Sequence, residues 1–438
     1  MKIKLIDDLA PEDIAMLQAL YSRSPASVDE HLVKVEDKGS AAFMDRFYIG
    51  YGHRSIGDCG TTTIFIEGVS MLCAKAIQDW PLYSGQEAST RYMDFSEAPF
   101  ANPVSNSAGE AIQQAWRETY LDLIAPVRDD LRKRYPRQTD EDEEVYERAI
   151  KARSFDILRA FLPAGATTNL SWTTNLRQAQ DHLNWLLHHP DLHVRHVAWN
   201  LYEALNNRYP HSFREERPEH QQYRTRVMHQ GYFLRPGEEG GRIEVEDGPT
   251  FRPEFTQRAL APEHLVLLRN RPRGAEVPWY FAEYGVLESI FALDFGSFRD
   301  LQRHRNGTVR MPLLTPDMGF HPWYLQELPE DRRDQACAFL QAQEHAINLL
   351  DCSDVTRQSY IAMGYVCRCH VTQPLPGFVY RLELRSSKTV HPTLRQVVLE
   401  EIEQFRRDFP ALALHVDEDP DSWTVRRGMQ TIKERSDD

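Results

Sequence analysis

The sequence has few cysteines and no excess of positive charge. Its 438 residues include six cysteines without the spacing of a disulfide framework, which fits a reducing compartment. Acidic residues outnumber basic ones by 65 to 51, and the formal net charge is -14. An acidic surface repels a polyanion, so we do not expect a nucleic acid to be the partner.

Long apolar runs are also missing. The first fourteen residues carry four acidic side chains and no apolar stretch, so we expect neither a secretory signal nor a membrane-spanning helix. The expected location is therefore the cytoplasm, without a membrane partner. Hydrophobic residues make up 41% and charged residues 26%, the balance of a globular chain long enough for two or three domains.

The apolar spacing predicts a mainly helical chain with a few short strands. Helices are expected at 11–20, 68–77, 108–131, 143–161, 177–187, 194–205, 334–350, 353–363 and 394–405. Strands are expected at 2–6, 61–66 and 242–246. Both halves end in an amphipathic helix followed by an aromatic residue and proline, at Tyr209-Pro210 and Phe409-Pro410, which indicates an internal repeat.

Three polar clusters could carry chemistry. The first is Gly52-His53-Arg54-Ser55. The second is Glu87-Ala88-Ser89-Thr90-Arg91-Tyr92, in which a hydroxyl and a guanidinium two residues apart can bind one phosphate; a solvated loop would explain it equally. The third is Arg303-His304-Arg305, a dense positive group whose alternative interpretation is a charged helix end.

Two further groups have the residue types of a metal site. His189 and His193 are four apart, and Cys367-Arg368-Cys369-His370 combines two thiols with an imidazole. Neither has the additional ligands of a complete site, so we expect no metal.

Taken in order, the polar clusters resemble the flavin-dependent thymidylate synthase family. Members of that family carry Gly-His-x-Ser, a Thr-Phe-x-Ile-x-Gly-x-Ser run and Arg-His-Arg followed by Glu-x-Ser-x-Arg-Tyr. The first half also contains Leu158-Arg159-Ala160-Phe161-Leu162-Pro163, Thr168-Asn169 and Thr174-Asn175-Leu176-Arg177 in the family's order. The resemblance covers residues 1–210, and 240–410 more weakly.

Each half departs from the family pattern in a different place. Counting back from Ser89, the Arg-His-Arg positions of the first half hold Asp79-Trp80-Pro81. The second half keeps the triad at 303–305 but has Leu313 at the serine position. An arginine that the family places against the uracil base corresponds to Leu186 in the first half and to Arg385 in the second. The two sets of losses are complementary.

The resemblance implies an α+β fold made of two tandem family domains, each a twisted sheet with long helices. We expect a first domain at 1–215, a linker at 216–240, a second, diverged domain at 241–410 and a tail at 411–438. Because the family assembles as a homotetramer, the implied assembly is a homodimer that mimics it.

The resemblance also implies reductive methylation of dUMP to dTMP, with FAD as cofactor and with NADPH and methylenetetrahydrofolate as co-substrates. The implied catalytic residues are Arg303 and Arg385. The implied substrate-binding residues are Glu87, Ser89, Arg91, Arg159, Arg303, Arg368 and Arg385, with Arg368 expected to be the repeat of Arg159. The implied cofactor-binding residues are His53, Ser55, Asn175, Arg177, His304, Arg305 and His391.

Two alternatives to dUMP methylation stay open. One is flavin-dependent modification of C5 in another pyrimidine nucleotide, such as UMP, since the motifs say little about the 2′ position. The other is a non-catalytic nucleotide- or flavin-binding descendant, which the split motifs would also fit.

Overall fold

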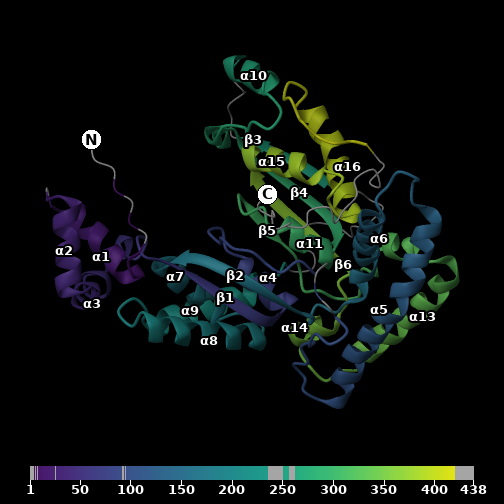
Figure 1. Ribbon diagram of the computed structural model, residues 1–438, viewed down its shortest axis with the longest axis horizontal. Coiled ribbons are helices and arrows are strands. Elements are labelled where there is room, and N and C mark those ends of the chain that lie inside the picture. The colour runs from purple at the N-terminus through teal and green to yellow at the C-terminus, as the bar shows by residue number, and fades with distance from the viewer. Residues whose placement is uncertain are drawn as a thin grey trace. The chain divides into compact units, whose positions relative to one another are not determined.

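The computed structural model describes residues 4, 6, 8–24, 26–90, 93, 95–234, 250–255 and 262–419. Helices combine with small antiparallel sheets, which confirms the predicted α+β class. The chain divides into two compact units (Figure 1). Unit 1 comprises Met1–Ala88 and Thr168–Tyr232; unit 2 comprises Ser89–Thr167 and Phe233–Asp438. Within the described ranges, no helix is long and apolar enough to cross a membrane.

Unit 1 is built on a two-stranded sheet, β1–β2. Its elements are α1 (Pro11–Tyr21), α2 (Val28–Lys38), α3 (Ala41–Phe43), the π-helical turn η1 (Met44–Gly50), the 3-10 turn η2 (Arg54–Ile56), β1 (Thr61–Ser70), α4 (Met71–Gln78), β2 (Thr167–Asn175), α7 (Leu176–Leu186), α8 (Leu192–Arg208) and α9 (Pro218–Gly231). Apolar side chains of β1, β2, α4, α7 and α8 form its core, with Trp172 and Leu183 fully buried.

Unit 2 is built on an antiparallel sheet of order β3-β4-β6-β5. Its elements are α5 (Ser107–Arg134), α6 (Glu143–Leu158), η4 (Arg159–Phe161), β3 (Thr250–Phe255), α10 (Pro262–Arg269), η6 (Trp279–Tyr284), β4 (Gly285–Asp294), α11 (Phe295–Leu301), β5 (Thr308–Arg310), α12 (Pro322–Glu327), α13 (Glu330–Asn348), α14 (Asp354–Arg357), η7 (Gln358–Tyr360), β6 (Val366–Pro374), α15 (Leu375–Arg385) and α16 (Pro392–Asp408). Helices α15 and α16 pack on the sheet, while α5 runs beside α6 and α13 (Figure 1).

Short polar side chains determine where several helices begin. Asn106, Asp142 and Asn175 each accept a hydrogen bond from a backbone N–H in the first turn of the helix that follows. Ser70 does the same for α4, so the helix expected at 68–77 begins only at Met71, and β1 extends through Ser70.

The expected helix at 353–363 and the expected strands at 242–246 and 2–6 are not confirmed. The helix expected at 353–363 is wrong, because only α14 and the 3-10 turn η7 form there and the following residues make a turn. The strand expected at 242–246 lies outside the described residues, as does most of 2–6.

The elements repeat in order and in length. Strands β1 and β4 both have 10 residues, and β2 and β6 both have 9. Helices α7 and α15 both have 11 residues, and α8 and α16 both have 17. The bridge between Ser84 and Thr173 corresponds to the pair Thr308–Thr372 in the sheet of unit 2, since Thr173 and Thr372 hold the same place in their strands. The likeness between the halves thus extends to strand register.

The turns after η4 and η7 pair with each other inside unit 2. The Ala164 N–H donates to the Ile361 carbonyl, and the Met363 N–H donates to the Leu162 carbonyl, both at 2.8 Å. Such reciprocal bonds are the pattern of a local two-fold axis between equivalent segments.

This pairing corrects one equivalence drawn from the sequence. Arg159 begins η4 and Gln358 begins η7, so the repeat of Arg159 is Gln358. Arg368 is the third residue of β6 and corresponds to Asn169, the third residue of β2. The predicted domain boundaries, 1–215, 216–240, 241–410 and 411–438, divide the chain by repeat, whereas the two compact units divide it by contacts. These boundaries stay a prediction.

Candidate functional site

The Arg-His-Arg triad lies in unit 2, directly after α11. The Arg303 side chain is 50% exposed, and its Nη2 lies 3.6 Å from Oδ1 of Asp300. His304 is buried, and Arg305 is anchored through a 3.5 Å hydrogen bond from Nη1 to the Arg303 carbonyl. Arg303 follows the N-cap Asp294 at the same distance as Asp79 follows the N-cap Ser70, so the structure places Asp79-Trp80-Pro81 at the triad positions of the first repeat.

Arg385, at the end of α15, joins the triad. Its Nε donates a 2.7 Å hydrogen bond to Nε2 of His304, and its Nη2 donates a 2.6 Å bond to the Asp300 carbonyl. Burial, together with the charges of Arg385 and Arg381, holds the pKa of His304 well below its ordinary value. The imidazole is therefore neutral near pH 7, with a lone pair on Nε2 that accepts from Arg385.

Asp300 brings the cations of unit 2 together. Besides Arg303 and Arg385, it lies 4.0 Å from Nη1 of Arg159, a residue of the first half of the sequence. Burial raises the pKa of Asp300, but these arginines outweigh it and the net shift is downward, so the group is a carboxylate. Unit 2 thus unites Arg159 of one repeat with Arg303, His304 and Arg385 of the other.

Arg159 also reaches a second, buried network. Its Nη2 donates a 2.8 Å bond to Oγ of Ser297, which lies 2.8 Å from Oγ1 of Thr393. Burial lowers the pKa of Arg159, but Tyr324 and the carboxylates of Asp294 and Asp300 together raise it by more. The net shift of the pKa is upward, so the guanidinium stays charged.

His391 belongs to the same network. Its Nε2 lies 2.9 Å from the Asp156 carbonyl, and Nδ1 lies 2.9 Å from Oγ1 of Thr393, at the N-cap of α16. His391 is buried and both of its ring nitrogens have protein partners; the expected flavin contact stays a prediction.

An open pocket of about 880 Å³ lies beside the triad within unit 2. Arg303, His304 and Arg305 line one part of it, and Tyr380 from α15 lies at its edge. The segment 274–280, which ends in Trp279 and Tyr280, also lines the pocket. The pocket therefore combines fixed cations with aromatic rings, a lining that suits a planar anionic ligand.

The predicted cofactor residues of the first half lie in unit 1. His53 is exposed and its Nδ1 is 3.3 Å from Nη2 of Arg23, while Ser55 lies in η2. Asn175 caps α7, and its side chain accepts from the Gln178 N–H at 2.8 Å.

Arg177 and Glu87 also lie in unit 1, and both have protein partners. Arg177 donates from Nε to Asp58 at 2.6 Å, and its Nη1 lies 3.5 Å from Asp181. Glu87 accepts a 2.8 Å hydrogen bond from Gln78.

Two of the remaining predicted residues, Ser89 and Arg368, lie on different segments of unit 2. Ser89 is exposed at the start of the first segment of unit 2, and Arg368 is half-buried on β6. Arg91, with its neighbour Tyr92, lies outside the described residues.

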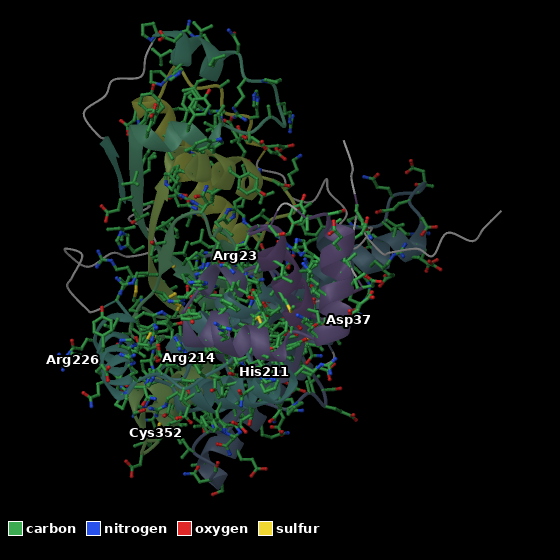
Figure 2. The ribbon with its side chains drawn as sticks, turned by 90° about the vertical axis from the view of Figure 1, so that its left-hand side faces the viewer. Arg23, Asp37, His211, Arg214, Arg226 and Cys352 are labelled. Carbon is green, nitrogen blue, oxygen red and sulfur yellow. The ribbon has the colours of Figure 1, made fainter. Side chains whose placement is uncertain are left out.

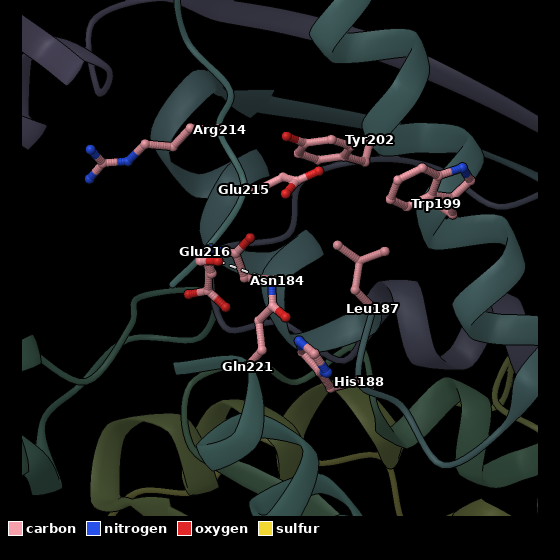
Figure 3. A pocket seen from close by; sticks show the side chains of 9 residues that line it. All are labelled: Asn184, Leu187, His188, Trp199, Tyr202, Arg214, Glu215, Glu216 and Gln221. Carbon is pink, nitrogen blue, oxygen red and sulfur yellow. Dashed lines mark hydrogen bonds between the residues drawn. The ribbon is translucent and has the colours of Figure 1, made fainter. Parts of the chain in front are cut away.

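Unit 1 has polar pockets of its own around the segment that follows α8. His211 and Arg214 lie on this segment (Figure 2), and the smaller pocket, about 160 Å³, lies between it and the helices (Figure 3). In it Gln221 donates a 3.0 Å bond to the Glu216 carbonyl.

The histidines near this region are engaged by the protein. His188 lies 2.9 Å from Oγ1 of Thr225, and burial lowers the pKa of His189 to about 3 while its Nδ1 accepts from the Asp191 N–H. Among the described residues, no group of three or more His, Cys, Asp or Glu side chains could hold a metal.

Comparison with known proteins supports the family resemblance in the first half of the chain. The model described as Thymidylate synthase complementing protein matches residues 4–211. The flavin-dependent thymidylate synthases of Pyrococcus abyssi and Thermococcus onnurineus are 25% and 23% identical; the matches cover 41% and 46% of this chain and 68% and 77% of those proteins. Through residues 4–211, just under half of its length, the chain is similar to the flavin-dependent thymidylate synthase family.

Other relatives match both halves. A UPF0159 protein of Chlamydia muridarum is 25% identical over 86% of this chain and 81% of its own length. One of Thermoplasma acidophilum is 23% identical over 92% and 94%. A solved flavin-dependent thymidylate synthase from Helicobacter pylori, complexed with FAD and dUMP, is 17% identical over 47% of this chain and 94% of that chain, with a TM-score of 0.29.

Several residues of the site were not predicted from the sequence. Asp300, Ser297 and Tyr380 became visible only in the structure. For Asp300 a signal existed, because an acid three residues before an arginine at the end of a helix is an ion-pair spacing. Tyr380 had none, since an aromatic residue on an amphipathic helix is most often part of the core.

Proposed function

We propose that the protein catalyses flavin-dependent reductive methylation of dUMP to dTMP, using methylenetetrahydrofolate and NADPH. The observation that supports this most strongly is the cluster of Arg159, Arg303, His304 and Arg385 around Asp300, in a chain whose first half matches the family. Fixed cations in a partly buried site can stabilise negative charge on a pyrimidine ring, which makes C5 nucleophilic without a cysteine.

The residues around the triad fit a flavin. The pocket of about 880 Å³ can admit a large planar ring, and Arg303 and Arg305 offer charge to its anionic part. When bound, FAD would supply the hydride; the protein would bind, orient and polarise. On the flavin side we place His304, Arg305 and His391 of the second repeat.

The first repeat would supply further contacts to both ligands. His53, Ser55, Asn175 and Arg177 are our flavin candidates there. For the nucleotide we assign Glu87, Ser89 and Arg91 of the first repeat, with Arg159, Arg303, Arg368 and Arg385. The neutral His304 would keep the Arg385 guanidinium oriented, because it accepts the Nε–H without adding a charge.

A binding protein without catalysis is the second candidate, and one observation favours it. Arg177, a flavin candidate, already contacts two carboxylates, Asp58 and Asp181, which compete with an external anion. An enzyme acting on UMP is the third, since nothing among the assigned residues selects the 2′ position.

One set of measurements separates these candidates. Purified protein is titrated with FAD and followed by flavin absorbance, then reduced anaerobically with NADPH. Tritium release from C5-labelled dUMP and UMP is measured with methylenetetrahydrofolate present. We expect the protein to bind FAD, to be bleached by NADPH and to release tritium from dUMP. Arg385→Gln is expected to reduce the tritium release at least tenfold. Arg208→Gln, a control at the end of α8, is expected to leave it unchanged. Binding without bleaching would support the second candidate, and release from UMP alone the third.

A further inference from the structure

The pocket beside the triad has aromatic side chains that the packing of unit 2 does not require. In the 3-10 turn η6, Phe281 and Tyr284 are buried and anchor the turn to the unit. Trp279, at the start of the same turn, is 84% exposed. Tyr380, which lines the same pocket from α15, is 59% exposed. Large exposed rings that line a pocket are typical of a binding surface.

The two repeats differ at these positions. Counted back from the strand that follows, Trp279 holds the place of Ser55 in the first repeat. Tyr380 and Asp181 are both the sixth residue of their helices, α15 and α7. In unit 1, Asp181 forms an ion pair with Arg54, the residue before Ser55. At these two positions the second repeat therefore has aromatic side chains where the first has polar ones, and both aromatic residues line the pocket.

The wall that carries Trp279 is held in place by a buried arginine. Arg271 is buried, donates to the Ala275 carbonyl within the wall and forms an ion pair with Glu383 of α15. Its Nη2 also donates a 2.9 Å bond to the Ala413 carbonyl. A bidentate guanidinium that joins the wall to the helix bearing Tyr380 fixes the two sides of the pocket before a ligand arrives.

Tyr380 contacts the triad through His304. Its ring lies 5.8 Å from the His304 ring in an edge contact, and His304 is in turn held by Arg385. Trp279 is in edge contact with Tyr280, with ring centroids 6.1 Å apart. The lining thus includes cations, aromatic rings from η6 and α15, and one acid, Glu276.

We propose that Trp279 and Tyr380 bind the planar ring system of an anionic flavin in the pocket beside Arg303-His304-Arg305, with Trp279 as the stacking residue. This rests on the proposed function and extends it, because it names a contact surface of the second repeat that the first repeat lacks. A tricyclic flavin ring offers two aromatic residues of one pocket a larger contact surface than a single pyrimidine ring does, and Arg303 and Arg305 complement its phosphates.

The test compares three variants in FAD titrations of the full chain. Trp279→Ala is expected to weaken FAD binding about 5- to 100-fold, the range for loss of one ring-stacking contact. Trp279→Phe keeps a stacking face and is expected to stay within about threefold of the unaltered protein. Trp199→Ala, which removes a 47% exposed indole that lines the small pocket of unit 1, is the matched control and is expected to have no effect.

A second readout is the fluorescence of bound FAD. An indole stacked on the flavin quenches its emission, so Trp279→Ala is expected to raise the emission of the bound state, while Trp199→Ala leaves it unchanged. If Trp279→Ala binds FAD with unaltered affinity and emission, the stacking contact does not exist and the proposed function stands. If the unaltered protein binds no FAD, the inference and the proposed function both fail. Because Trp279 is largely exposed, its replacement leaves the fold intact, which circular dichroism checks.

Discussion

At the scale of single residues, Asp300 compensates the positive charge of three arginines in unit 2. Arg159, Arg303 and Arg385 converge on it, two of them through its carboxylate and one through its carbonyl. Without this carboxylate the guanidinium groups would repel one another in a partly buried place. Asp300 was invisible to motif reading, because it belongs to none of the family's patterns.

We predict that Asp300→Asn lowers the free energy of unfolding by about 1–3 kcal/mol, since the side chain keeps its shape but loses the charge that compensates the arginines. The uncompensated cluster then attracts anions more strongly, so inorganic phosphate should raise the melting temperature of the variant more than that of the unaltered protein. Asp331→Asn, at an exposed ion pair on α13, is the control and should change neither value. Equal stabilisation of all three proteins by phosphate would contradict this account.

A second residue, His182, couples the stability of unit 1 to pH. It is fully buried beside Trp80, with ring centroids 4.7 Å apart, and its Nε2 lies 2.8 Å from the Ile77 carbonyl. Burial lowers the pKa of His182 from 6.5 to about 4. The ring is therefore neutral in the folded protein at pH 6, whereas in the unfolded chain it is largely protonated there.

We predict that the free energy of unfolding falls as the pH drops from about 6.5 to about 4, because over this range the unfolded chain binds a proton at His182 that the folded protein does not. The difference corresponds to roughly 3 kcal/mol at the acidic end. In denaturant titrations at several pH values, His182→Gln should flatten this dependence, and His196→Gln, at an exposed site on α8, should not. His189 behaves similarly and preserves part of the slope. A variant with an unaltered slope would show that His182 is not the titrating group.

At the scale of elements, the sequence predicted the long helices well and the junctions poorly. α5, α6, α8, α13 and α16 all follow the predicted apolar spacing, because each buries one face. The helix expected at 353–363 does not form beyond the short α14 and the 3-10 turn η7. Residues 361–363 instead form a turn that pairs with the turn after η4. The two turns exchange backbone hydrogen bonds, and the same N–H and C=O groups would be bonded within the helix if a helix formed here. Such long-range pairing leaves no local signal in the sequence.

The paired turns leave no room for a side chain at Gly165. A Cβ built there would lie 2.5 Å from the Ser359 carbonyl oxygen and 3.1 Å from that of Ala101, both backbone atoms that cannot move aside. We predict that Gly165→Ala lowers the free energy of unfolding by about 2 kcal/mol or more, through overpacking. Gly231→Ala is the control, because nothing lies within 4 Å of its Cβ position and alanine favours the helix. Chemical denaturation measures both, and equal stability of the two variants would mean that the turns do not pack this closely.

At the scale of the whole molecule, the repeat explains which site residues could be found from the sequence. The triad and Arg385 were placed by counting along motifs, and the structure brings His304 and Arg385 into contact. The compact units follow a different division from the repeats, since unit 2 contains residues of both. Arg159 of the first repeat consequently contacts Ser297 of the second, which no reading of either half alone could show.

The same asymmetry predicts the number of ligands. Where the second repeat has Arg303 and Arg385, the first has Asp79 and Leu186, an acid and an apolar group that disfavour a dianionic phosphate. We predict that dUMP, titrated calorimetrically with FAD present, saturates at one per chain. Arg385→Ala should weaken its binding by roughly 2–5 kcal/mol, because the phosphate or base loses a charged partner in a partly buried site. Leu186→Met, at the equivalent position of the first repeat, is the control and should leave the affinity unchanged. Two nucleotides per chain, or equal effects of the two substitutions, would show that both repeats bind the nucleotide and that their differences carry no function.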